Sequence, residues 1–278
     1  MLLYNTLASI PQNLIVNCLQ KQYEYSGYET AGNNNANHMK NFLNSYLTES
    51  KCINLESGDY PSPFLTISRQ AGCSAKRIAI KLSKILTGYS YMSETKTDVE
   101  WKYVDKDMFL EVVEELTDEL KWGEYEDAEE SILFLKDVGK AFADETIYDI
   151  SDDKMIAALK GIICRLANHG RTIIVGRSAG AILRSIPNKL NIRLEAPAEW
   201  RINRIMQIKD MTQTEAAEYI TQADKKRDAF IEKIIGRKAE NEDFDVIFNY
   251  ATMEDDQIVD AVINILRNKK IIAPHYEF

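Results

Sequence analysis

The feature that most constrains the fold is a series of short apolar runs, rich in β-branched residues, that alternate with longer amphipathic segments. The runs have the length of buried strands and lie at residues 64–68, 101–104, 172–175, 190–194 and 245–248. The segments between them place apolar residues at helical spacing, as at 76–86 and 257–267. Strands separated by helices form a mostly parallel sheet that is covered on both faces. We therefore expect an α/β sandwich of three layers built on five strands.

Two of the connecting segments are long. Residues 106–168 have a helical pattern with acidic breaks, and residues 197–238 form a helical stretch rich in charge. In sheets of this kind, ligands bind at the carboxyl ends of the strands. The residues that follow each strand are therefore the candidates for function, and they are residues 68–77, Asp105, Gly176 with Arg177, residues 196–204 and Asn249.

Residues 1–60 have a different character. We predict short helices at 11–20 and 38–47, with a polar, asparagine-rich loop at 27–37 between them. A linker with one glycine and two prolines follows at 51–63. We therefore divide the chain into an extension, residues 1–60, and a main domain, residues 61–278. The apolar positions of the extension leave two alternatives open, that it covers its own domain or a partner chain in a homo-oligomer.

Composition narrows the class of partner. The formal net charge is −9 and the sequence pI is about 5.1, which argues against nucleic acid or an anionic membrane surface. The four cysteines and three histidines are scattered without metal-ligand spacing, so we expect no zinc site. The first twenty residues lack the basic segment of a signal peptide, and no apolar run is long enough for a membrane helix. The sequence thus predicts a soluble, cytoplasmic protein with reduced thiols.

The turn after the first strand, residues 68–77 (SRQAGCSAKR), is where a phosphate loop would lie, with backbone N–H groups facing an anion. The standard pattern is GxxxxGK[ST]. The chain departs from this pattern in both possible registers. If Ala75 takes the place of the lysine, the two glycine positions hold Arg69 and Ser74. If Lys76 is the lysine, the glycine positions hold Gln70 and Ala75. Two alternatives stay open here: an altered phosphate loop, or an ordinary turn between a strand and a helix.

Basic residues follow the third and fourth strands. Arg177 comes after Val175 and Gly176, at a strand end where an arginine can bind phosphate through two hydrogen bonds. Arg201 and Arg204 are three residues apart and so share one helical face, as do Asp224 and Arg227. A cluster of cations in an acidic chain suits phosphoryl transfer, which depends on charge stabilisation. The alternative is a charged helix facing solvent.

In this order, the motifs resemble the cytidylate kinase-like family of P-loop kinases. The matching segments are residues 67–69 with Gly72 and Lys76, then 103–106, 174–177, 196–204, 224–227 and 244–249. The resemblance covers residues 63–267. It implies a P-loop kinase-like sandwich with a helical lid, and transfer of the γ-phosphoryl group of ATP to CMP or dCMP with Mg²⁺. The family usually reads Gly-Ser-Gly-Gly-Arg in the loop, where this chain has GCSAK, and its better-characterised members carry an acid where this chain has Ser178.

The resemblance also assigns roles by position. The ATP phosphates would be held by Ser68, Arg69, Gly72, Cys73, Ser74, Ala75, Lys76 and Arg77. The acceptor nucleotide would be contacted by Asp105, Arg177, Asp224 and Arg227. Lys76, with Arg201 and Arg204 from the lid, would neutralise charge during transfer. Two other functions stay open: a catalytically impaired module that binds nucleotide or another protein, and a kinase for a different small metabolite.

Overall fold

A computed structural model describes residues 63–92, 100–110 and 170–272, together with single positions between 114 and 167. The helices, loop and most of the linker that the sequence predicts within residues 1–63 lie outside the described residues. The chain divides into two compact units. One comprises Met1–Ser57 and Lys106–Arg165. Its described residues all lie between 106 and 164 and are helical, as predicted for residues 106–168. The other comprises Gly58–Asp105 and Leu166–Phe278 and holds the sheet. The domain boundary near residue 60 stays a prediction.

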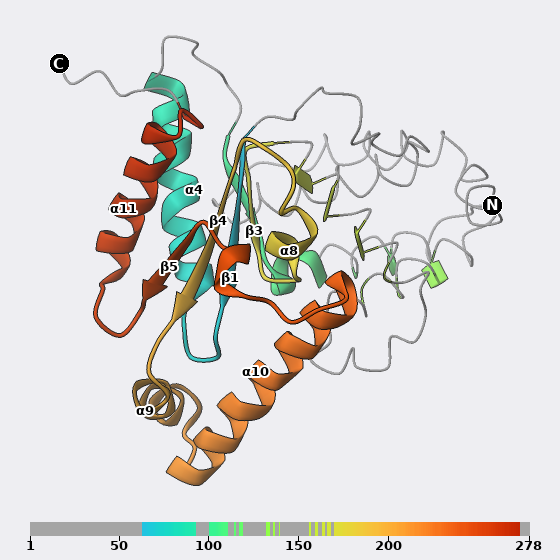
Figure 1. Cartoon of the computed structure of the whole chain (residues 1–278), viewed down its shortest axis with the longest axis vertical. Coiled ribbons are helices and arrows are strands. Elements are labelled where there is room, and N and C mark those ends of the chain that lie inside the picture. Colours follow the sequence, from blue (N-terminus) through green and yellow to red (C-terminus); the bar gives the residue numbers. More distant parts are fainter. Residues whose placement is uncertain are drawn as a thin grey trace. The chain divides into compact units, whose positions relative to one another are not determined.

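Five strands form a parallel sheet in the order β2-β3-β1-β4-β5. They are β1 (Phe64–Arg69), β2 (Lys102–Val104), β3 (Thr172–Val175), β4 (Lys189–Glu195) and β5 (Val246–Asn249). All five predicted strands are present, with ends that differ by at most one residue. Because the strands are parallel, their carboxyl ends lie at one edge of the sheet, so the predicted strand-end residues meet there (Figure 1).

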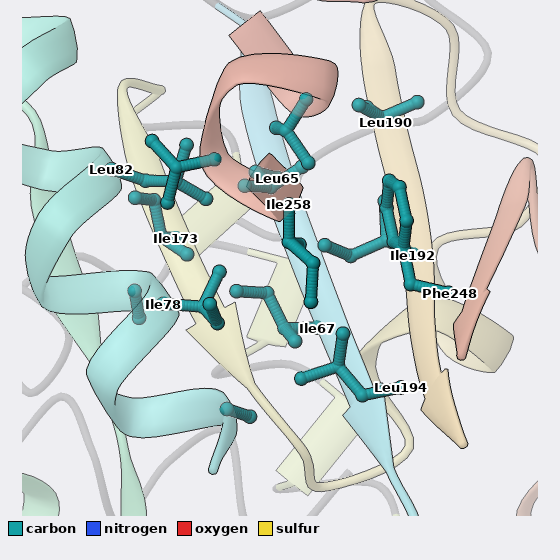
Figure 2. Packing of buried hydrophobic residues seen from close by; sticks show 14 of the residues in the cluster. Leu65, Ile67, Ile78, Leu82, Ile173, Leu190, Ile192, Leu194, Phe248 and Ile258 are labelled. Atoms are coloured by element: carbon teal, nitrogen blue, oxygen red, sulfur yellow. The ribbon is translucent and has the colours of Figure 1, made fainter. Parts of the chain in front are cut away.

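Two helices cover one face of the sheet, α4 (Ala75–Met92) and α11 (Asp255–Asn268). Ile78 and Leu82 of α4 and Ile258 of α11 are fully buried and pack over Ile67 and its neighbours in the sheet (Figure 2). Each fully buried side chain of this kind contributes about 1.5–3 kcal/mol. The apolar residues whose spacing predicts these helices therefore form the faces that pack against the sheet.

The opposite face of the sheet carries a buried polar network around Asn191 of β4. The Asn191 side chain accepts a hydrogen bond from the Thr66 hydroxyl at 2.5 Å and donates one to the backbone carbonyl of Asp243. The short helix α8 (Ala179–Ile182) places Gly180 directly over the Asn191 amide. Side chains alternate between the two faces of a strand, so α8 lies on the face opposite the one on which Ile192 packs. The sheet therefore has helices on both faces.

The predicted helical stretch at 197–238 is two helices, α9 (Ala198–Lys209) and α10 (Gln213–Ile235). Asp210 adopts a left-handed conformation with φ of 54°, which ends α9. Thr212 then caps α10 in a reciprocal arrangement with Glu215, each side chain accepting from the other residue's backbone N–H. α9 lies beyond the carboxyl end of β4, and α10 runs from there back toward α8 (Figure 1). Among the described residues, no helix is long and apolar enough to cross a membrane.

A side chain at Gly180 is predicted to destabilise the protein, because a Cβ atom there would overlap the Asn191 side-chain amide. We expect Gly180→Ala to lower the free energy of unfolding by about 1–3 kcal/mol, the usual cost of overpacking a core. The matched control is Gly88→Ala in α4, where a Cβ would meet nothing within 4 Å. That change should be neutral or stabilise by up to about 1 kcal/mol, since alanine favours helix. Denaturant unfolding of both variants measures the difference, and equal effects would contradict the prediction.

Candidate functional site

The candidate phosphate loop connects β1 to α4 at the carboxyl edge of the sheet. Of the eight residues predicted to hold phosphate, Ser68 and Arg69 are the last two of β1, and Ala75, Lys76 and Arg77 begin α4. Gly72, Cys73 and Ser74 lie in the loop itself. Gln70 fastens the loop to the end of β4: its N–H donates to the Leu194 carbonyl at 3.0 Å, and its side-chain oxygen accepts from the Ala196 N–H at 3.1 Å.

Gly72 is the one glycine of the loop and has a positive φ of 91°. A Cβ atom there would lie 3.2 Å from the Cβ of Arg201 in α9. The loop therefore needs glycine at this position for its backbone conformation and for the close approach of α9. Two other loop amides are used within the loop, since the Cys73 N–H donates to the Gln70 carbonyl and the Ala75 N–H to the Cys73 carbonyl.

Ala71 is held from both sides by charged side chains of α9 and α10. Its N–H donates to Asp224 Oδ1 at 2.7 Å, and its carbonyl accepts from Arg201 Nη1 at 3.3 Å. Arg201 and Asp224 are themselves ion-paired, and Arg227 donates to Asp224 at 3.1 Å. Two residues that the sequence marks as candidates, Arg201 and Asp224, therefore meet at one loop residue, and a third, Arg227, is joined to them through Asp224.

Arg204 is placed against the loop by two aromatic rings. Its guanidinium lies 5.2 Å from the Trp200 ring centre and 5.3 Å from that of Tyr250, and it donates to the Ser74 hydroxyl at 3.1 Å. Cation–ring contacts at this distance are attractive and fix the side chain. Its Nε atom is buried without a hydrogen-bond partner, and within the described part of the chain no carboxylate is paired with it. Arg204 thus differs from Arg201, whose charge is compensated.

Tyr250, which follows β5, is buried between the site and α11. Its hydroxyl donates to Asp255 Oδ1 at 2.7 Å, and the other oxygen of Asp255 pairs with Arg77. Burial, together with the hydrogen bond to the Asp255 carboxylate, raises the pKa of Tyr250 to about 12. The phenol therefore stays neutral and fixed over the whole physiological range. Arg77 is turned toward α11 by this contact.

Lys76 and Asp105 meet across the loop. The Lys76 ammonium lies 2.9 Å from Asp105 Oδ2 at the end of β2; the lysine side chain is 46% exposed and that of Asp105 only 6%. A half-exposed lysine beside a phosphate loop can exchange a carboxylate for a phosphate oxygen without being taken out of water. The sequence predicts Lys76 as a contact of the ATP phosphates and Asp105 as a contact of the acceptor nucleotide, and the structure brings the two side chains together.

Arg177 follows β3 in a turn of unusual conformation. Gly176, Arg177 and Ser178 all have positive φ values, between 55° and 78°. For a non-glycine residue this conformation costs free energy, so the surrounding structure must hold it. One contact that does so is the hydrogen bond from the Gly176 N–H to the Ile67 carbonyl at 2.9 Å. The turn sets Arg177 at the same edge of the sheet as the loop, and the hydroxyl of Ser178 beside it is buried without a partner.

Cys73 offers no nucleophile despite its place in the loop. Burial raises the pKa of its thiol to about 11, although nearby Arg201 acts in the opposite direction. The thiol is therefore protonated at neutral pH, and its buried side chain fills space under the loop.

A family model described as the cytidylate kinase-like family matches residues 64–252, which include the loop, all five strands and the α9–α10 pair. The chain belongs to the cytidylate kinase-like family. Two solved structures are similar to it at low identity. An uncharacterized protein from Eubacterium ventriosum ATCC 27560 has 17% identity and a TM-score of 0.48, over 74% of this chain and 99% of that one. Shikimate kinase from Bacteroides thetaiotaomicron has 13% identity and a TM-score of 0.38, over 74% and 96%. No curated protein sequence matches the chain.

Some members of the site were not predicted from sequence. Trp200 stands inside the family segment but was not given a role, and Tyr250 is one residue beyond the strand-end asparagine that was named. The signal that could have found Tyr250 is its position, directly after a strand at the ligand edge. Nothing local marks Asp255 or Ala71, because their importance comes from contacts with residues far away in the sequence.

Tyr250→Phe tests the support beneath Arg204. Removing the hydroxyl should cost about 1–2 kcal/mol of unfolding free energy at pH 7, because the Asp255 oxygen loses a hydrogen bond. The pKa is raised in the folded state, so the wild-type hydroxyl contributes fully below about pH 10 and its contribution is lost as the pH rises to about 12. The stability gap between wild type and variant should therefore narrow between pH 10 and 12 in urea unfolding. A gap that stays constant over this range would contradict the assignment.

Proposed function

We propose that the chain transfers the γ-phosphoryl group of ATP to a nucleoside monophosphate, with CMP or dCMP as the preferred acceptor. The observation that carries the proposal is Arg204, a cation that touches the loop, is held in place by two rings and has no paired carboxylate among the described residues. A fixed and uncompensated charge beside a phosphate loop is what stabilises a transferring phosphoryl group. Membership of the cytidylate kinase-like family supports the acceptor class.

The chemistry asks for positioning rather than for a reactive side chain. Lys76 would exchange its contact with Asp105 for a phosphate oxygen at the start of α4. Arg204 would contact the transferring group from α9, and Arg227, a third of whose side chain is exposed, would contact an oxygen from α10. Arg177 would bind the acceptor phosphate from the end of β3.

Magnesium would fit this site as an ion bound mainly by the phosphates of the nucleotide. Among the described residues there is no group of three or more side chains that could hold a metal ion. Nucleotide-bound Mg²⁺ needs only one or two carboxylates, because phosphates and water supply its other ligands. Asp105 is the carboxylate at the loop that could serve, and the ion would then supply charge neutralisation between the phosphates.

A non-catalytic nucleotide-binding or protein-interaction module is the second candidate. The Ala71 amide is committed to Asp224, and those of Cys73 and Ala75 to carbonyls of the loop itself. A loop with several committed amides offers fewer donors to a triphosphate than a glycine-rich loop does. This arrangement would suit binding without turnover.

Release of ADP in a coupled assay tests the first proposal. The acceptors tested are CMP, dCMP, UMP, AMP and GMP, because Ser178 replaces the acid of the better-characterised cytidylate kinases and leaves the choice of base open. We expect Arg204→Gln to lower kcat/KM about a hundredfold or more, as losing one donor to a developing charge does. The matched control is Lys209→Gln, which removes the same charge from the far end of α9 and should leave the rate unchanged.

Thermal unfolding with ATP–Mg²⁺ separates the two candidates. A ligand at about 100 times its dissociation constant should stabilise the protein by about 2.7 kcal/mol. Stabilisation without turnover of any acceptor would support the non-catalytic module. If ATP–Mg²⁺ gives no stabilisation and no acceptor is turned over, nucleotide binding is rejected altogether.

A further inference from the structure

Side chains of α9 and α10 form hydrogen bonds with both the N–H and the carbonyl of Ala71 in the loop. Asp224 accepts from its N–H, Arg201 donates to its carbonyl, and the two side chains are paired with each other at 2.5 Å. Ala71 and Asp224 are 153 residues apart in sequence. The conformation of the loop at this residue is therefore set by α9 and α10 as well as by its own sequence.

Packing reinforces the same connection. Ala71 is 3% exposed and lies in a small apolar cluster with residues of both helices, Ile205, Ala216, Ile220 and Ala223. The next residue, Gly72, lies so close to α9 that a Cβ atom there would be 3.2 Å from the Arg201 Cβ, which is tighter than an ordinary contact. The loop and the two helices thus share one packed core.

Arg201 has little to offer a ligand directly. Its side chain is 10% exposed, its Nε donates to the Ala196 carbonyl at 3.0 Å, and its Nη1 serves Ala71 and Asp224. By contrast, Arg227 keeps a third of its side chain exposed while one of its nitrogens is fixed by Asp224. This largely buried ion pair therefore orients neighbouring groups, and Arg227 is one of the groups that it orients.

We propose that Asp224 is a positioning residue that sets the phosphate-binding shape of the loop through Ala71 and fixes Arg227 beside it, without contacting phosphate. This inference rests on the proposed function of the loop as a phosphate site. Glycine-rich loops bind anions through several amides in a fixed concave arrangement. In this chain, where glycines are replaced, the Arg201–Asp224 pair supplies the constraint from outside the loop.

The experiment compares wild type with Asp224→Asn, which keeps the size of the side chain and removes its charge. Glu218→Gln is the matched control, because Glu218 is an exposed carboxylate on the same helix. The first measurement is amide hydrogen exchange of the peptide spanning residues 70–75, without ligand. We expect faster exchange in Asp224→Asn and wild-type exchange in the control. Unchanged exchange in Asp224→Asn would overturn the proposal.

The second measurement is calorimetric affinity for pyrophosphate with Mg²⁺. Asp224→Asn should bind about tenfold more weakly or worse, the loss expected for one hydrogen bond to a charged group. Tighter binding would overturn the proposal, because it would mean that the carboxylate competes with phosphate. Affinity equal to that of Glu218→Gln would overturn it too.

A double variant, Arg201→Met with Asp224→Leu, separates positioning from stability. Replacing a buried ion pair by apolar residues of similar volume commonly restores the stability that a single replacement removes. We expect the thermal midpoint of the double variant to return toward wild type while pyrophosphate affinity stays low. Recovery of affinity together with stability would show a purely structural role and overturn the proposal. The double variant also decides the question if Asp224→Asn does not fold.

The two proposals fail in different ways. If wild type binds neither pyrophosphate nor ATP, the proposed function fails, and the exchange measurement alone judges the link between Asp224 and the loop. If wild type binds and Asp224→Asn binds equally well, the positioning role fails and the proposed function stands.

Discussion

β1 is hydrogen-bonded along both of its edges, to β3 on one side and to β4 on the other. All three strands run in the same direction, so the loop that leaves β1 emerges between the turns that follow its two neighbours. Residues from β3 and β4 therefore surround that loop whatever its own sequence is. The site depends on this pairing before it depends on any side chain, because the pairing brings residues 70–76, Arg177 and Arg201 to one edge.

The charge balance at this edge shows how an acidic chain can hold cations in place. Lys76 is paired with Asp105, Arg77 with Asp255, and Arg201 and Arg227 with Asp224. A cation packed into the protein without an anion is costly, so these carboxylates stabilise the ligand-free state. Arg204 is stabilised in another way, by the faces of Trp200 and Tyr250, which compensate charge without supplying an oxygen that a phosphate must replace. A phosphate that reaches Arg204 therefore gains a contact and breaks no ion pair there.

The strands were predictable because each is a short β-branched run, and burial on both faces of a parallel sheet requires such a run. The break between α9 and α10 was missed, although Thr212 and Glu215 carry the spacing of a reciprocal cap. Charge in the surrounding stretch hid that signal, since the exposed helical pattern continues on both sides. The polar network of Asn191 could not be predicted, because an isolated asparagine in a strand does not reveal which distant groups will satisfy it.

The site was predictable to the level of strand ends and no further. Position after a strand identified Lys76, Asp105 and Arg204 as candidates, and the fold does bring each to the carboxyl edge. Their partners follow from packing between distant segments, which a single sequence does not encode locally. Arg201 illustrates the difference. It lies three residues from Arg204 on one helical face, but it is buried against the Ala71 carbonyl, whereas Arg204 donates to the Ser74 hydroxyl.

The loop lacks most of the glycines that normally let phosphate approach the backbone, and this lack favours a catalytically impaired protein. Glycine has a second effect, which is that a chain rich in it must be held in shape by its surroundings. A loop with fewer glycines loses less conformational entropy when it is ordered, and here Ala71 is ordered further by two charged side chains and an apolar cluster. Only at Gly72, where α9 comes within contact distance, does the backbone still require glycine. Replacement of the other glycines is therefore compatible with an ordered anion site, provided that α9 and α10 remain attached to the loop.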